Sequence, residues 1–264
     1  MQSKLISEAE IQELLQFTSV SHAVAWLKRT PEYAKAWADL DETSIHRGQI
    51  EKLLKISIFA DFSKIYQFAN PEQRKFLDLY SRRYEIRVLK ELMTNLFDHR
   101  DTDPVDVSPY REFFHRHSKL DLDRLTACTT MDEFINSLKE NEFYVPLSRI
   151  QNHDTALLFD YGMALDLYYF SMIWNVRKKL FSGKDLEQIT MAYGEKFDML
   201  NLQFISRSKR YFHMAPAVIY ALLIPVNYKL HKKDIAALVE AETMTAFESL
   251  LDQTYYGRRY EKLN

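Results

Sequence analysis

The sequence predicts an all-α protein, and three observations carry that prediction. Only five glycines and seven prolines occur in 264 residues, while the helix formers Leu, Lys, Glu, Ala and Gln are plentiful. Apolar residues recur with helical spacing along most of the chain. The strongest hairpin signals, Asn-Gly and Asp-Gly dipeptides, do not occur. With 47% apolar residues, a chain of this length can bury a substantial core.

The opening segment predicts two short helices. Ser7 and Glu10 have the spacing of a capping box, in which the hydroxyl and the carboxylate each satisfy a backbone N–H at a helix start. Thr18 and Ser19 then separate this helix from the next one. The two apolar faces consist of Ile11, Leu14 and Leu15, and of Val20, Ala23, Trp26 and Leu27.

The same pattern returns at offsets of 111 and 224 residues. Its later cap pairs are Ser118 with Asp121 and His231 with Asp234. Thr130 and Thr243 stand at the positions that correspond to Ser19. Helical hairpins bury their apolar faces by stacking on neighbours. We therefore expect a single all-helical domain over residues 1–264, a compact, funnel-like, pseudo-threefold body of three related units, approximately 1–110, 111–222 and 223–264.

A second repeat lies between these units, because YEIRVLKEL from Tyr84 aligns with FDMLNLQFI from Phe197 at an offset of 113. In each copy an aromatic-acidic pair is predicted to open a long amphipathic helix. The polar turn at Asn70-Pro71-Glu72 and the charged, proline-containing stretch 98–109 are predicted to be joints within the domain.

Charge and composition exclude several classes of protein. The 35 Lys and Arg residues nearly balance 37 Asp and Glu, and the net charge of −2 disfavours a nucleic-acid partner. The single cysteine, Cys128, has no partner for an internal disulfide. The N-terminal stretch has no apolar run typical of a signal peptide. The longest apolar run, 215–226, is interrupted by proline and falls short of the roughly 20 residues that span a bilayer.

Chemical motifs are weak throughout the chain. Glu112 and His115 form one Glu-x-x-His pattern, but a di-iron helical bundle needs two such patterns, and His117 would point to a different side of the helix. We therefore expect no metal site. Cys128 occupies a small or apolar position of the repeat, where packing is the expected role. Five glycines cannot supply a phosphate-binding loop, so neither direct nucleotide binding nor a cofactor is expected.

Two basic clusters are candidates for partner binding. Arg207, Lys209 and Arg210 lie together on a predicted helix, and Arg82 and Arg83 precede the equivalent helix one repeat earlier. Such charges usually form a solvated face, but exposed cations also steer docking and set its register.

Several segments, taken in order, resemble the C subunit of V/A-type ATPases and its eukaryotic counterpart, the d subunit of the V-ATPase. The resemblance is strongest from Gly183, in GKDLEQITMAYGEKFDMLNLQF, and continues through LLIPVNYKL to VEAETMTAFESLLDQTYYG. SKLISEAEIQELL, RTPEY and YEIRVLKELM resemble the opening and middle units of the family, whereas residues 40–70 carry little resemblance. Members of this family are usually longer and carry a further N-terminal helix, so the resemblance implies a trimmed or divergent member.

The resemblance implies a non-catalytic adaptor in the central stalk of a rotary ATPase. Such an adaptor sits on the cytoplasmic face of the membrane proteolipid ring, peripheral to the membrane, and receives the rotor-shaft subunits. It carries torque between shaft and ring for ion transport or ATP synthesis. Two other classes remain open from the residues alone: a generic helical-repeat scaffold, and a helical enzyme, for which no convergent set of ionisable groups is visible.

Overall fold

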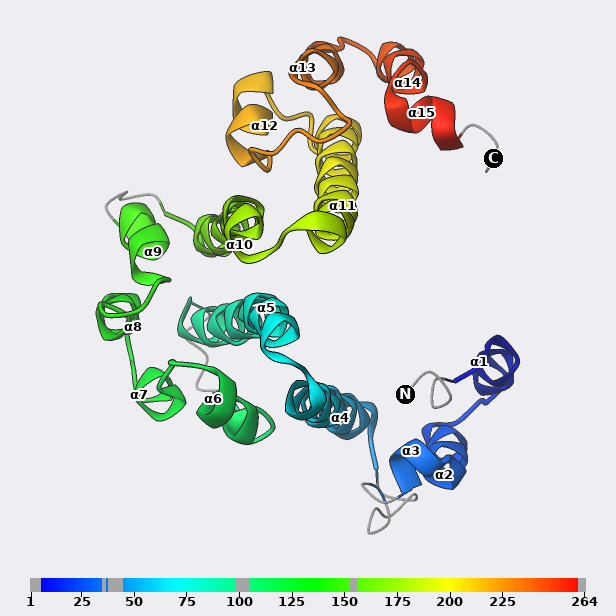
Figure 1. Cartoon of the computed structure of the whole chain (residues 1–264), viewed down its shortest axis with the longest axis vertical. Coiled ribbons are helices and arrows are strands. Elements are labelled where there is room, and N and C mark those ends of the chain that lie inside the picture. Colours follow the sequence, from blue (N-terminus) through cyan, green and yellow to red (C-terminus); the bar gives the residue numbers. More distant parts are fainter. Residues whose placement is uncertain (1–5, 35–36, 38–44, 98–104, 152–155, 261–264) are drawn as a thin grey trace. The chain divides into compact units, whose positions relative to one another are not determined.

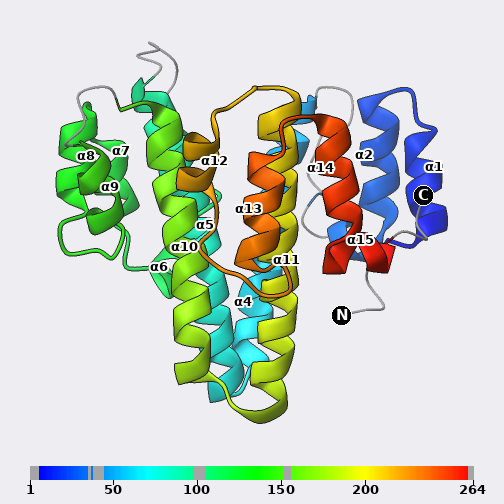
Figure 2. The same ribbon diagram turned by 90° about the horizontal axis from the view of Figure 1, so that it is seen from above.

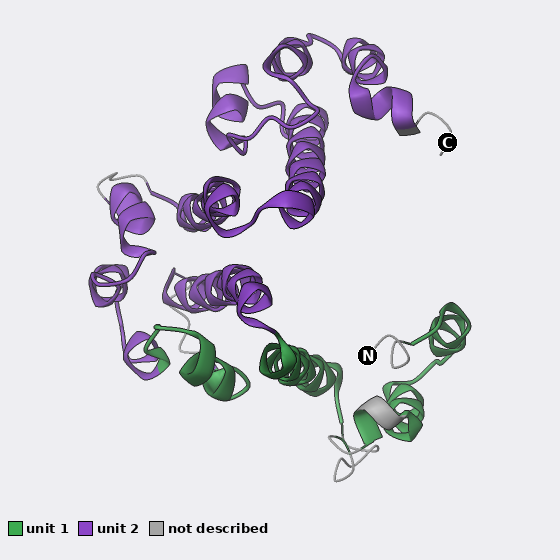
Figure 3. Ribbon diagram, in the orientation of Figure 1, with its two compact units in different colours: residues 1–69, 106–122 green, residues 70–105, 123–264 purple. Residues whose placement is uncertain are grey.

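In the computed structural model, which describes residues 6–34, 37, 45–97, 105–151 and 156–260, every regular element is a helix (Figure 1). The all-α prediction is confirmed. The chain divides into two compact units, the first formed by residues 1–69 and 106–122 and the second by residues 70–105 and 123–264 (Figure 3). The pseudo-threefold arrangement of three units stays a prediction.

The first unit begins with the two short helices that the sequence predicts, α1 (Glu8–Leu15) and α2 (Val20–Arg29). The capping box of α1 is present: the Ser7 N–H donates to the Glu10 carboxylate at 2.7 Å, and the Glu10 N–H donates to the Ser7 hydroxyl at 3.4 Å. Ser19 caps α2 by accepting the N–H of His22 at 3.2 Å. The short α3 (Pro31–Ala34) follows directly.

The rest of the first unit is built around aromatic side chains of α4 (Arg47–Phe68) and α6 (Arg111–His117). Phe62 of α4 packs against Phe113 and His117 of α6, with ring centroids 5.2 and 5.5 Å apart. Edge and tilted ring packing of this kind stabilises a small core beyond its buried area. These contacts hold the short α6 along the much longer α4.

The second unit is centred on α10 (Leu158–Leu180), which packs against α5 (Pro71–Phe97), α9 (Tyr144–Gln151) and α11 (Gly183–Arg210). Figure 2 shows α5, α10 and α11 running side by side. The remaining helices are short: α7 (Leu122–Thr126), α8 (Met131–Ser137), α12 (Pro216–Leu222), α13 (Lys232–Glu240), α14 (Met244–Asp252) and α15 (Tyr255–Tyr260).

The caps predicted for the repeats are present in part. The cap pair predicted at His231 and Asp234 is present, because the His231 N–H donates to the Asp234 carboxylate at 3.0 Å at the start of α13. Thr130 accepts the N–H of Glu133 and Thr243 accepts the N–H of Ala246, as Ser19 does in the first copy. At Ser118 the prediction is wrong: its hydroxyl accepts the N–H of Leu120 at 3.0 Å in the turn after α6, and α7 begins only at Leu122. The residues from Ser118 to Asp121 lead into the helix and are not its first turn.

The prediction that an aromatic-acidic pair opens each long helix is also wrong. Tyr84 and Phe197 lie in the middle of α5 and α11. The start of α5 is set instead by Asn70, whose side chain accepts the N–H of Gln73 at 2.9 Å, followed by Pro71 at the first helical position. The predicted joint at 70–72 is found as a boundary between α4 and α5, but Pro71 and Glu72 already belong to α5. Most of the predicted loop 98–109 lies outside the described residues.

A fully buried carboxylate anchors the connection between α12 and α13 to α11. Asp198 accepts the backbone N–H groups of Tyr228, Lys229 and Leu230 at 3.2, 2.6 and 2.8 Å. It also accepts the hydroxyl of Tyr256 in α15 at 2.8 Å, and burial together with this bond raises the pKa of Tyr256. A single side chain of α11 thus satisfies donors from two later segments of the chain.

The same connection needs two further residues of α11. The side-chain amide of Asn201 donates to the carbonyl of Ile224 at 3.0 Å and accepts the N–H of Ile224 at 2.9 Å. Gly194 makes room for the ring of Tyr228, because a Cβ at this position would lie 2.4 Å from that ring. Side chains of α11 therefore hold this segment by hydrogen bonds to its backbone, and the ring of Tyr228 packs closely against Gly194.

We predict that Asp198→Ala lowers the free energy of unfolding by about 3 kcal/mol, because three backbone N–H groups and the Tyr256 hydroxyl lose their shared acceptor, which is itself fully buried. Urea unfolding followed by circular dichroism measures this loss. Glu187→Ala removes an exposed carboxylate from the same helix and is expected to change stability by no more than about 0.5 kcal/mol. Equal effects of the two variants would contradict the anchoring role of Asp198.

Candidate partner interface

The five cations predicted to bind a partner lie on the two long helices of the second unit. Arg82 and Arg83 are in the middle of α5, and Arg207, Lys209 and Arg210 form the last turn of α11. Cations in a last turn interact favourably with the partial negative charge at the C-terminal end of a helix. The prediction that Arg207, Lys209 and Arg210 lie on a helix is confirmed, whereas Arg82 and Arg83, which were predicted to precede a helix, lie within one. The environments of the five side chains differ.

Arg82 is held by carboxylates inside the second unit. Its guanidinium donates to Glu85, which is 1% exposed, at 3.0 and 3.1 Å, and lies 2.7 Å from the carboxylate of Glu142. Glu142 also accepts the hydroxyl of Tyr168 from α10 at 2.6 Å. Burial opposes the charge of Arg82, but the two carboxylates outweigh it and raise the pKa of Arg82. This side chain connects α5 to the segment before α9.

Arg83, by contrast, is exposed and rests on tyrosine rings. Its guanidinium carbon lies 5.0 Å from the ring centre of Tyr80 and 5.6 Å from that of Tyr84, and it donates to the Tyr80 hydroxyl at 2.6 Å. Cation–π contacts of this kind orient a guanidinium without neutralising it. Arg83 therefore presents a fixed positive charge at the surface of α5.

The cations at the end of α11 also include side chains that are bonded within the unit and one that is not in an ion pair with any described residue. The ammonium group of Lys209 donates to the carbonyl of Val239 in α13 at 2.6 Å, and Arg210 pairs with Glu248 in α14 at 2.9 Å. Arg207 is exposed and makes no ion pair with any residue that the structure describes. Of this cluster, Arg207 is the side chain available to another protein.

Arg83 also lines a groove between α5, α10 and α11, of about 410 Å³, which we call the basic groove. Three further cations line it, Arg87 and Lys90 from α5 and Lys196 from α11. These three residues are not among the cations predicted from the sequence to bind a partner. The signal was present in the spacing of Arg83, Arg87 and Lys90, which places all three on one face of a helix.

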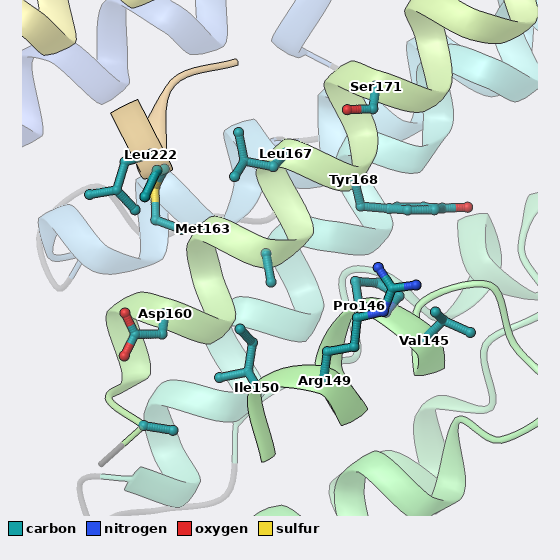
Figure 4. Close-up of a pocket in the computed structure, with 13 residues that line it drawn as sticks. Val145, Pro146, Arg149, Ile150, Asp160, Met163, Leu167, Tyr168, Ser171 and Leu222 are labelled. Atoms are coloured by element: carbon teal, nitrogen blue, oxygen red, sulfur yellow. The ribbon is translucent and has the colours of Figure 1, made fainter. Parts of the chain in front are cut away.

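A second groove, of about 670 Å³, is mainly apolar and lies between α9, α10 and α12 (Figure 4). Its apolar lining includes Val145, Ile150, Met163, Leu167 and Leu222. Arg149 and Asp160 add charges to the lining. This groove could not be predicted from the sequence. Apolar residues on one side of α10 are buried in the core and those on another side line the groove, and the two sets look alike in the sequence.

The residues weighed for metal binding and nucleophilic chemistry have structural contacts. Glu112 pairs with Arg116 at 2.8 Å, and His117 packs among aromatic rings of α4. The thiol of Cys128 lies 3.4 Å from the carbonyl of Arg124, and burial raises the pKa of this thiol. In the described part of the chain, no group of three or more His, Cys, Asp or Glu side chains is arranged to hold a metal ion.

No helix within the described ranges combines the length and the apolar character needed to cross a bilayer.

Comparison with known proteins shows similarity to a protein family and to a characterised subunit. The model of the family described as ATP synthase (C/AC39) subunit matches residues 1–264. The C subunit of the A-type ATP synthase of Methanothermobacter thermautotrophicus is 22% identical, in an alignment that covers 97% of this chain and 63% of the relative. The chain thus spans less than two thirds of the length of that relative.

The two arginines of α5 are predicted to respond differently to replacement by alanine. Arg82→Ala leaves the buried Glu85 without its cation and is expected to lower the free energy of unfolding by about 2 kcal/mol. Arg83→Ala is expected to cost less than about 1 kcal/mol, because this side chain is exposed. Urea unfolding of both variants tests the assignment. If the two losses are equal, Arg82 is not the structural residue of the pair.

Proposed function

The chain belongs to the ATP synthase (C/AC39) subunit family, which is the family of the V/A-type ATPase C subunits, and we propose from this premise that it is a non-catalytic adaptor in the central stalk of a rotary ATPase. In this role it links the rotor-shaft subunits to the membrane proteolipid ring. Torque then passes through it, for ion transport or for ATP synthesis. It acts from the cytoplasmic side, peripheral to the membrane.

The observation that carries this proposal is the family match over all 264 residues. The packing of the second unit supports it physically. An element that transmits torque must resist deformation, and close-packed helices linked by buried polar bonds do so. Asp198 links α11 to the segment before α13 and to α15, and Arg82 links α5 to the segment before α9. These bonds join segments that are far apart in sequence.

In the proposed function, other subunits of the complex bind and hydrolyse ATP. A chain with five glycines lacks the sequence patterns that bind phosphate through a glycine-rich loop. We therefore propose that it neither binds nor hydrolyses ATP and works through its surfaces alone. Arg83 and Arg207, whose charges are exposed, are the proposed partner-binding residues of the two basic clusters.

Reconstitution tests the adaptor function. The purified chain is expected to co-purify with rotor-shaft subunits, to recruit them to a proteolipid ring in lipid nanodiscs, and to show no ATP hydrolysis alone. A shaft that binds the ring equally well without this chain would contradict the proposal. Nucleotide hydrolysis by the isolated chain that survives repeated purification would also contradict it.

Arg207→Glu is predicted to weaken assembly with shaft and ring about tenfold, because reversing an exposed charge changes docking far more than folding. The melting temperature should stay the same. Lys184→Glu reverses one positive charge at the other end of α11 and serves as the control. Lys209 and Arg210 are poor positions for this test, because both hold neighbouring helices. Unchanged binding of Arg207→Glu would remove Arg207 from the contact.

A further inference from the structure

The basic groove concentrates positive charge in a chain whose net charge is −2. Four cations line it, and its single acidic residue, Asp166, pairs with Lys90 at 2.6 Å. Arg87 and Lys196 make no ion pair with any described residue. Burial, and then the charge of Arg83, lower the pKa of Lys196. Like charges are therefore held close together without enough anions from the fold to balance them.

The spacing of the cations gives the groove a direction. Arg83, Arg87 and Lys90 follow each other at intervals of four and three residues on one face of α5. At a rise of about 1.5 Å per residue, this row is about 10 Å long. Lys196 and Leu200 of α11 line the opposite side with the same four-residue interval. The lining is thus a row of charges and not a single point.

The repeat explains why the two sides match. The offset of 113 residues that relates Tyr84 to Phe197 places Lys196 on Arg83 and Leu200 on Arg87. Equivalent faces of α5 and α11 therefore line one groove, and α10 lies against both helices. Aromatic rings of Tyr84 and Tyr169 add apolar surface between the charges.

We propose that the basic groove binds an acidic α-helical segment of a partner polypeptide, with carboxylates spaced to face Arg83, Arg87, Lys90 and Lys196. A helix with Glu at intervals of four and three residues matches the length of the row, whereas one phosphate group is too short to reach along it. The tyrosine rings cover the aliphatic parts of such Glu side chains. We assign the acidic helix to a rotor-shaft subunit, and this assignment rests on the proposed adaptor function.

Labelled peptides test the chemistry of the groove with the full-length chain. One peptide of about 18 alanine-rich residues, long enough to form a helix, carries Glu at these intervals, and a second carries Gln at the same positions. Fluorescence anisotropy is expected to show binding of the Glu peptide, at least about tenfold weaker binding of the Gln peptide, and a loss of affinity as salt is added. Equal affinities of the two peptides would overturn the proposal.

Charge-removing variants place the binding in the groove. Arg87→Gln combined with Lys196→Gln is expected to weaken binding of the Glu peptide about tenfold. Neither residue has an ion pair to lose among the described residues, so circular dichroism and the melting temperature should stay the same. Lys178→Gln combined with Lys184→Gln removes the same net charge from exposed positions outside the groove and is expected to bind normally. Equal weakening by both pairs would overturn the proposal.

Two further measurements separate this inference from related ones. Displacement of the Glu peptide by inorganic pyrophosphate at equimolar concentration would show a compact anion site and overturn the helix proposal. Rotor-shaft subunits are then tested against the Arg87 and Lys196 double variant. If they bind the original chain and the variant equally, the inference fails and the adaptor function stands. If the Glu peptide binds as expected but the shaft subunits do not, the adaptor function fails and the groove chemistry stands.

Discussion

The carboxylate of Asp198 is the interaction on which the C-terminal part of the second unit depends. This carboxylate is fully buried in α11. It accepts three backbone N–H groups from the segment before α13 and the hydroxyl of Tyr256 in α15. With Gly194 and Asn201, it fastens the non-helical connection before α13 to the surface of α11. The stretches from Gly183 onward that resemble the family contain all of these residues. What is recognisable in the sequence is therefore also what the packing requires.

The repeat uses one position in two ways. Glu85 and Asp198 correspond at the offset of 113 residues, and both are buried in the middle of a long helix. Asp198 accepts backbone donors, whereas Glu85 accepts the guanidinium of Arg82. A buried carboxylate must be hydrogen-bonded or paired, but its position does not determine which partner does this. Positions that align in the sequence can therefore both hold a buried carboxylate while the partners of that carboxylate differ.

Local signals predicted the helical fold well, although they misplaced the cap at Ser118 and the starts of the two long helices. The roles of several side chains depend on interactions at long range. The cap pairs Ser7 with Glu10 and His231 with Asp234 join residues three positions apart, so sequence reasoning placed them correctly. The role of Lys209 depends on a carbonyl 30 residues further along, which no local pattern reveals. The basic groove was missed for the same reason, because its two sides come from helices that are separated in the sequence by α6 to α10. The pseudo-threefold arrangement stays a prediction, since it concerns how whole units are placed.

The structure divides the cations of the two long helices into those that hold the fold and those that remain available to a partner. Arg82, Lys209 and Arg210 are engaged by groups of their own unit. Arg87, Lys196 and Arg207 are not paired with any described carboxylate. The cations along the basic groove outnumber its carboxylates, so they repel one another when no partner is bound. An acidic helix relieves that cost on binding, and the same charges that are unfavourable in the free chain then set the position and register of its partner.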